Sequence, residues 1–140
     1  MIVISNTSPI IYFASVGRLS LIKDLYSIIY IPTEVWNELM SPILLGKEGL
    51  PIDIKFEIEA KETGWIIVKV PIKDENLELA LNLSHDLGRG EAYAIALSME
   101  LSADLLLINH KKAKEIVEKM GITIKWSTEI LLDAVEKKNN

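Results

Sequence analysis

Short apolar runs alternate along this chain with longer segments of mixed polarity. The apolar runs end at glycine, proline or polar residues, which is typical of buried strands. They cover residues 2–5, 28–31, 65–70, 104–108 and 122–126. Helical spacing and end signals predict helices at 9–14, 18–25, 33–40, 53–63, 75–84, 90–102, 111–120 and 128–138, the last capped by Ser127. Strands this apolar, alternating with helices, predict a mostly parallel sheet in a three-layer α/β/α, Rossmann-like fold.

The length and composition predict a globular protein with one domain over residues 1–140. The chain contains no apolar run of roughly 18 residues and no basic segment before its first apolar run, so we expect neither a membrane span nor a signal peptide. It also contains no cysteine, which excludes disulfides and thiolate metal sites and fits the reducing cytoplasm. The net charge of −5 is not that of a typical nucleic-acid-binding protein, but a bound divalent cation can supply local positive charge.

Polar residues follow two of the predicted strands. Asn6 follows the first strand, and Asn109 and His110 follow the fourth. The carboxyl ends of parallel strands are where sites are built in such sheets. Each asparagine can offer a carbonyl oxygen to a hard cation or form an Asx-turn, and the turn is the more common role. His110 can serve as a proton shuttle or a ligand, or it can be an ordinary loop residue.

Glu91 is the strongest single candidate for a functional residue. It lies in the first turn of a predicted helix, at the head of a mostly apolar stripe that continues through Ala94, Ile95, Ser98 and Met99. A carboxylate in that position is unfavourable unless it is paired or binds a cation. The alternative is an acidic residue that interacts with the free N–H groups of the helix start.

Glu38 lies at the edge of the apolar stripe of its own predicted helix. Glu34 precedes it by one turn, so two like charges share one side, and Glu38 also opposes the helix dipole. A nearby cation would reverse both effects. Taken alone, Glu38 has the features of a solvated surface residue.

Three lysines, Lys111, Lys112 and Lys114, open the helix that follows His110. They could bind the phosphates of RNA near the helix N-terminus, although a solvated lysine face is the more common structure. Glycine-rich phosphate loops, HExxH and G-x-S-x-G are all absent from the sequence.

Taken together, these segments resemble the PIN-domain family, and within it the small prokaryotic branch of VapC-like toxins. Residues 2–11 resemble its opening strand and turn, and residues 32–39 its second motif. Residues 90–96 resemble its third motif, and residues 105–110 the strand that leads to its fourth. The motifs occur in the family's order over nearly the whole chain.

The resemblance implies a ribonuclease in which acidic side chains hold Mg²⁺ or Mn²⁺, which activates a water to attack a phosphodiester. By position, Glu38 and Glu91 keep their carboxylates, and Asn6 stands where the family usually has an aspartate. The usual fourth acid falls at Asn109 or at His110. Each lost carboxylate removes charge from a site for a hard cation, so the resemblance predicts the fold more directly than the activity.

Two hypotheses of function follow. The first is a metal-dependent endoribonuclease, a toxin held by an antitoxin, with Ser8 orienting a ligand from beside the site. The second is a non-catalytic PIN-like module that binds RNA or protein and has a degenerate metal site. A Rossmann-like ligand-binding protein is a third possibility, which the missing glycine-rich loop argues against. Because residues 42–45 are apolar and the mean hydropathy is +0.25, we also expect a homodimer or an antitoxin complex.

Overall fold

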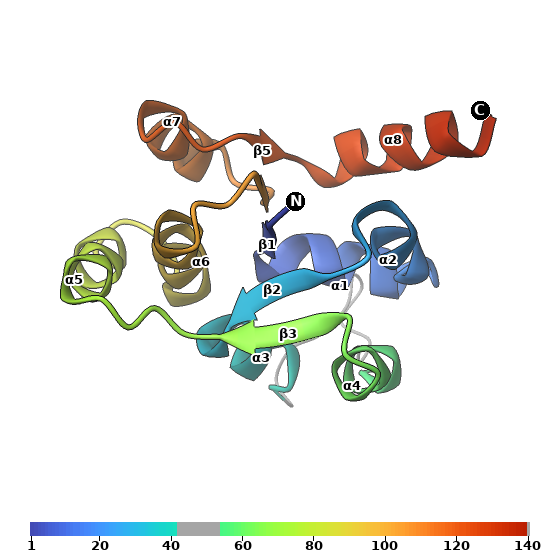
Figure 1. Cartoon of the computed structure of the whole chain (residues 1–140), viewed down its shortest axis with the longest axis horizontal. Helices are drawn as coiled ribbons and strands as arrows, with labels where there is room; N and C mark the ends of the chain where they lie inside the picture. The colour runs from blue at the N-terminus through green and yellow to red at the C-terminus, as the bar shows by residue number, and fades with distance from the viewer. Residues whose placement is uncertain (42–53, 140) are drawn as a thin grey trace.

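The computed structural model describes residues 1–41 and 54–139, in which five strands and eight helices alternate (Figure 1). The strands are β1 (Val3–Ser5), β2 (Ile29–Pro32), β3 (Ile66–Lys69), β4 (Leu105–Leu107) and β5 (Ile124–Lys125). The helices are α1 (Thr7–Ser15), α2 (Ser20–Tyr26), α3 (Thr33–Leu39), α4 (Lys55–Glu62), α5 (Asp74–Leu83), α6 (Arg89–Glu100), α7 (Lys111–Lys119) and α8 (Ser127–Asn139). Every strand and helix that the pattern predicted is present. The apolar segment 42–45 lies outside the described residues.

The five strands form one sheet in the order β3-β2-β1-β4-β5, and all neighbouring strands are parallel. The central strand β1 pairs on both sides, with Ile4 in register with Tyr30 of β2 and Leu106 of β4. The predicted α/β fold with a parallel sheet is therefore confirmed.

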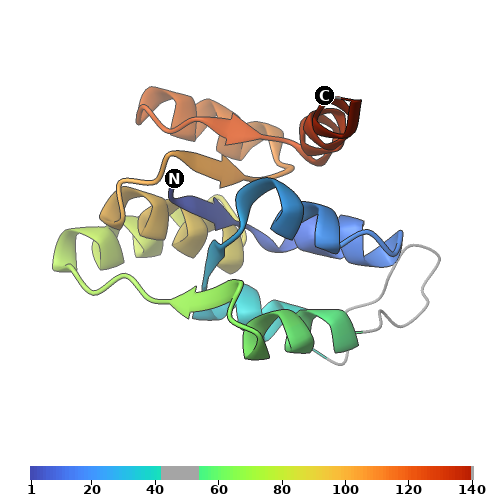
Figure 2. The ribbon, with the colours of Figure 1, turned by 45° about the vertical axis from the view of Figure 1, so that its right-hand side comes forward.

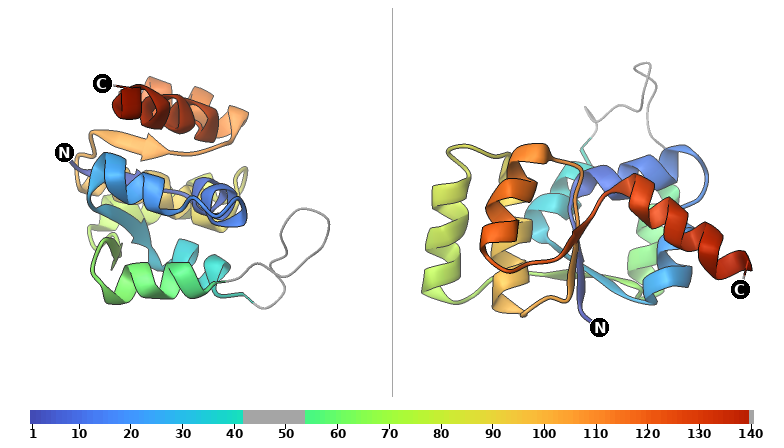
Figure 3. Two further views of the ribbon diagram at one scale, coloured as in Figure 1. Left: turned by 90° about the vertical axis from the view of Figure 1, so that its right-hand side faces the viewer. Right: turned by 90° about the horizontal axis from the view of Figure 1, so that it is seen from above.

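Helices cover both faces of this sheet (Figures 2 and 3). Successive side chains of β1 enter different cores, because a strand alternates its side chains between faces. Val3 packs with residues of α1, α2, α3, α4 and α8, whereas Ile4 packs with residues of α6 and α7. Helix α5 packs against α6. The side chains of Val3 and Ile4 are both fully buried, which explains why the strand sequences are apolar on both faces.

The order of the strands reverses between β1 and β4. From β1 the chain runs outward through β2 and β3, and then returns across the sheet to β4 and β5. In open parallel sheets this reversal leaves a crevice at the carboxyl ends of the two strands. Asn6 directly follows β1 and Asn109 lies two residues beyond β4, so both asparagines stand at this reversal.

Most element boundaries differ from the predictions by one or two residues, and three of the differences have a visible physical reason. Strand β5 has only two residues, since Ile122 is buried in a core but pairing begins at Ile124. Helix α1 begins at Thr7, because Asn6 already has the extended backbone of an N-cap. Ser127 was wrongly predicted to cap α8. It is the first residue of that helix, and Glu129 Oε1 accepts the N–H of Trp126 at 3.0 Å instead.

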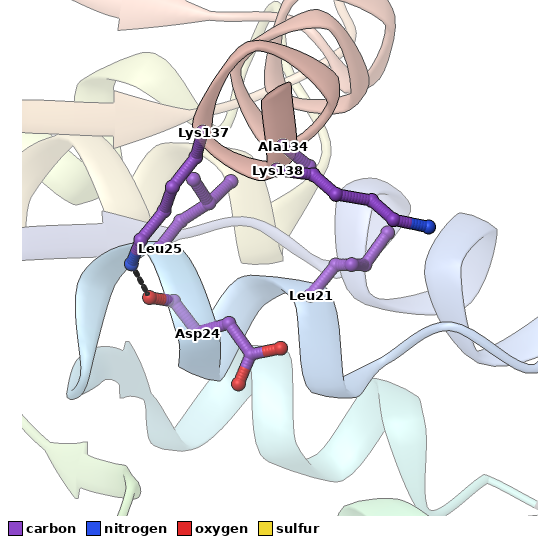
Figure 4. Close-up of a pocket in the computed structure, with 6 residues that line it drawn as sticks. All are labelled: Leu21, Asp24, Leu25, Ala134, Lys137 and Lys138. Atoms are coloured by element: carbon purple, nitrogen blue, oxygen red, sulfur yellow. Dashed lines mark hydrogen bonds between the residues drawn. The ribbon is translucent and has the colours of Figure 1, made fainter. Parts of the chain in front are cut away.

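Helix α8 packs against α2, and Lys137 Nζ donates a hydrogen bond to the carbonyl oxygen of Asp24 at 2.5 Å (Figure 4). A cavity of about 460 Å³ lies between the two helices. It is lined by Leu21, Asp24, Leu25, Ala134, Lys137 and Lys138, none of which is a candidate site residue. None of the helices in the described part of the chain has the length and apolar character needed to cross a bilayer.

Glu100, the last residue of α6, caps the start of α5. Its carboxylate accepts the backbone N–H groups of Ile72 and Lys73 at 2.9 and 2.8 Å and the side-chain amide of Asn76 at 3.2 Å. Partial burial opposes ionisation, but these hydrogen bonds and the charge of Lys73 outweigh it and lower the pKa of Glu100. The ionised carboxylate therefore stabilises the α5–α6 pair.

We expect Glu100→Gln to destabilise the protein by about 1 kcal/mol at pH 7, the usual scale for a lost helix cap. The folded pKa is lowered, so this contribution is present above the unfolded pKa and is lost as the pH falls through the folded value. Urea unfolding at pH 7 and at about pH 3 checks this. Glu115→Gln, an exposed change on α7, is the control. A difference between Glu100→Gln and wild type that did not shrink in acid would contradict the capping role.

Candidate functional site

Glu38 links three helices through its carboxylate. Its Oε2 accepts the hydroxyl of Thr7, at the start of α1, at 2.5 Å. Its Oε1 accepts the N–H of Gly90, in the first turn of α6, at 3.1 Å. With both oxygens bonded to distant parts of the chain, Glu38 is not a solvated surface residue. It therefore joins the residue after Asn6 to the residue before Glu91.

Gly90 permits the approach of Glu38. A Cβ atom at position 90 would lie 2.5 Å from Glu38 Oε1, well inside van der Waals contact. Glycine is the residue that allows such close approach to backbone.

Glu91 uses only one of its carboxylate oxygens. Oε1 accepts the N–H of Gly88, the N-cap of α6, at 3.2 Å, so Glu91 caps the start of its own helix. Oε2 is buried and has no hydrogen-bond partner. Both interpretations of Glu91 therefore describe part of its structure: one oxygen caps the helix, and the other remains available to a cation.

His110 lies against the free oxygen of Glu91, with Nδ1 3.4 Å from Oε2. The same Nδ1 accepts the N–H of Ala113 at 3.1 Å, so His110 is the N-cap of α7. This contact places the imidazole of His110 beside the carboxylate of Glu91.

Asn6 occupies the N-cap position of α1, but its side chain makes no capping hydrogen bond. The residue is only 3% exposed, and its Oδ1 is buried without a partner. The Asx-turn interpretation of Asn6 is therefore wrong. An unsatisfied buried carbonyl costs about 1–3 kcal/mol, and an absent ion is one recognised reason for such an atom.

Asn109 is engaged elsewhere. Its Nδ2 donates to Ser127 Oγ at 2.6 Å, and its Oδ1 accepts the Ser127 N–H at 2.8 Å. This reciprocal pair joins the end of β4 to the start of α8. As a metal ligand, Asn109 would have to use the same Oδ1 that accepts the Ser127 N–H. A ligand role for Asn109 stays a prediction.

Ser8 was expected to orient a ligand from beside the site, but the hydroxyl that contacts Glu38 belongs to Thr7. Thr7 is 6% exposed and donates to Glu38, whereas Ser8 is exposed. The sequence gives no signal that separates these two hydroxyls, because both follow Asn6 in one short polar run.

The three lysines lie in the first half of α7, where Lys111 and Lys112 are exposed and Lys114 is half-buried. Lys112 Nζ lies 3.7 Å from Asp86 Oδ1, and Lys114 Nζ lies 3.9 Å from Glu118 Oε1. Lys111 is exposed. Surface pairs of this kind contribute little to stability, and a role in RNA binding stays a prediction.

Two residues that the sequence did not single out line a cavity beside Glu38. Glu34, one turn earlier on α3, has a buried Oε1 without a partner, and its Oε2 lies 3.8 Å from Arg89. The cavity has a volume of about 330 Å³. Its lining residues are Glu34, Asn37, Glu38, Ser41 and Arg89.

The unpartnered oxygens fit a hard divalent cation in chemical type. Asn6 Oδ1 and Glu91 Oε2 are carbonyl and carboxylate oxygens, the ligands that Mg²⁺ and Mn²⁺ prefer. Among residues 1–41 and 54–139, however, no group of three or more His, Cys, Asp or Glu side chains is placed to hold a metal ion. The candidate set therefore depends on the neutral oxygen of Asn6.

A family model described as a PIN domain matches residues 2–139 of this sequence. A comparison with curated proteins found no match. The family match covers nearly the whole chain and includes all four resembling segments. PIN domains have a nuclease-type fold and generally use divalent metals, which agrees with the parallel sheet and with the unpartnered oxygens of Asn6 and Glu91. The chain therefore belongs to the PIN-domain family.

Proposed function

We propose that this protein is a divalent-metal-dependent endoribonuclease. The observation that carries the proposal is the pair of buried oxygens without partners, Asn6 Oδ1 and Glu91 Oε2, which flank the residues that Glu38 joins. Buried polar atoms are nearly always satisfied in folded proteins, so two unpartnered oxygens, each on a residue next to one that Glu38 contacts, favour a role as cation ligands.

Asn6 and Glu91 would hold the ion, and Glu38 would add negative charge beside it. A bound Mg²⁺ or Mn²⁺ would polarise a phosphoryl oxygen and lower the pKa of a coordinated water. Thr7 and Gly90 fix the Glu38 carboxylate from two sides, so its charge is already placed before any ion arrives. The imidazole of His110 lies 3.4 Å from Glu91 Oε2, on the side away from Gly88.

The net charge of −5 strengthens the requirement for a cation. A phosphate that approached Glu38 and Glu91 without an ion would meet like charge, and a bound dication would reverse the sign of the local field.

The test is calorimetric titration of the chelator-treated protein with Mn²⁺, followed by incubation with a labelled single-stranded RNA in Mn²⁺, Mg²⁺ or EDTA. We expect saturable Mn²⁺ binding and cleavage only when an ion is present. Absence of both saturable Mn²⁺ binding and metal-dependent cleavage would contradict the proposal.

Gly90→Ala gives a second test of the Glu38 position. The new methyl group would displace the end of the flexible Glu38 side chain rather than backbone, so we expect the protein to fold, with a melting temperature lowered only by the loss of the Glu38 hydrogen bonds to Thr7 and Gly90. Displacement of the carboxylate should lower the cleavage rate by roughly tenfold or more, because the misplaced negative charge no longer supports a cation held beside it. Melting curves and cleavage rates measured side by side check this. Cleavage at the wild-type rate would contradict a functional role for Glu38.

The second candidate function is a non-catalytic PIN-like module that binds RNA or protein. It is favoured by the neutral Asn6 and by the use of Asn109 in the bond to Ser127, since both reduce the charge available to an ion. RNA binding without cleavage in any divalent ion would favour this function over the nuclease.

We also propose that the nuclease is the toxin of a toxin–antitoxin pair and forms a homodimer when free. Helix α8 offers apolar surface to a partner, since Leu132 is 62% exposed and Val135 is 50% exposed. Light scattering of the isolated chain, and co-purification with the product of the neighbouring reading frame, test the two parts. A monomer at high concentration that captures no such product would contradict both.

A further inference from the structure

Arg89 stands at the edge of the candidate site. It is the first residue of α6 and precedes Gly90, whose N–H group holds Glu38. Its side chain lines the 330 Å³ cavity together with Glu34 and Glu38. The cavity therefore places one guanidinium beside two carboxylates.

Two contacts orient the Arg89 guanidinium and leave most of it exposed to solvent. Arg89 Cζ lies 5.2 Å from the ring centre of Tyr93, one turn along α6, at cation–π distance. Arg89 Nη2 lies 3.8 Å from Glu34 Oε2, which is longer than a hydrogen bond. The Arg89 side chain is still 68% exposed. A planar cation is thus oriented by a ring and a weak ion pair while it faces solvent.

We propose that Arg89 binds a backbone phosphate of the RNA substrate, next to the phosphate that is cleaved. Guanidinium groups bind phosphate through two parallel hydrogen bonds, and stacking on an aromatic ring reduces the freedom lost on binding. Glu34 holds Arg89 in place before RNA arrives and yields it to the phosphate. Arg89 is a substrate-positioning residue, and this inference rests on the proposed ribonuclease function.

A purely structural role for Arg89 would be to neutralise Glu34. The two roles make different predictions for the double variant Arg89→Gln/Glu34→Gln. If Arg89 only neutralises Glu34, removing both charges together should restore normal RNA binding. If Arg89 binds phosphate, the double variant should remain impaired in RNA binding.

The experiment measures binding of a fluorescent single-stranded RNA by anisotropy in Mn²⁺ over a range of salt concentrations, together with KM and kcat for cleavage. We expect Arg89→Gln to weaken RNA binding and raise KM by roughly tenfold, with Mn²⁺ affinity unchanged. The salt slope of binding should fall by about 0.7, the value for one phosphate contact on a single strand. The RNA affinity of Arg89→Lys should lie between those of wild type and Arg89→Gln, because lysine keeps the positive charge but cannot donate two parallel hydrogen bonds to one phosphate.

Arg18→Gln is the matched control, since Arg18 lies on the exposed turn between α1 and α2 and donates to the carbonyl oxygen of Gly17. Unchanged RNA affinity and salt slope in Arg89→Gln, or recovery in the double variant, would overturn the proposal, as would a wild-type protein that does not bind RNA. RNA that is bound but not cleaved would contradict the nuclease proposal alone, and the anisotropy comparison would still decide the role of Arg89.

Discussion

Glu91→Gln is expected to lower Mn²⁺ affinity sharply and to slow RNA cleavage by on the order of 10²-fold or more. Glutamine preserves the shape of the side chain and can still accept the N–H of Gly88 through Oε1, so the cap of α6 should survive. The charge of the buried oxygen beside His110 is lost. Metal-assisted stabilisation of the transition state is worth several kcal/mol, which gives the expected factor.

Glu115→Gln provides the control, because it removes one carboxylate from an exposed position on α7. It should match wild type in calorimetry and in cleavage, and melting curves should show both variants folded. If Glu91→Gln kept normal Mn²⁺ affinity and normal cleavage, Glu91 would be only a helix cap, and the metal site would have to lie elsewhere.

The fold could be predicted from the sequence because each strand carries its own signal. The run at residues 2–4 carries apolar side chains on both faces, and Val3 and Ile4 are buried in the two cores that helices close on either side of the sheet. Glycines also stop helices where the pattern indicates, as Gly121 does after α7 with a φ of 77°. The length of β5 could not be predicted, because burial of Ile122 and pairing of Ile124 have the same apolar signal.

The candidate site was less predictable, because its contacts join residues that are far apart in the chain. The Glu38 carboxylate is held by groups 31 and 52 positions away, and no local pattern encodes either bond. Taken alone, Glu38 has the sequence features of a surface residue. Asn109 was grouped with Asn6 because both follow strands. The side-chain amide of Asn109, however, makes two hydrogen bonds with Ser127, which lies 18 positions later. Glu34 and Arg89 were missed because their relation exists only where α3 meets α6.

Asn6→Asp is expected to raise Mn²⁺ affinity by about 1–2 kcal/mol, after a discount for desolvation. The change replaces a neutral carbonyl oxygen with an anionic one of nearly equal size, so packing at this buried position should hardly alter. Cleavage should rise in parallel if low ligand charge limits the site. Without metal, the same change should lower the melting temperature, because the new carboxylate would join Glu38 and Glu91 as a third like charge.

These opposite effects separate a cation site from a structural asparagine. Calorimetry with Mn²⁺ and melting curves in EDTA measure them on the same preparations. Asn82→Asp, an exposed change on α5, makes the same substitution outside the candidate residues and should change neither Mn²⁺ affinity nor metal-free melting appreciably. If Asn6→Asp left both quantities unchanged, the free Oδ1 of Asn6 would not face a cation site. The non-catalytic module would then be the better description of this PIN domain.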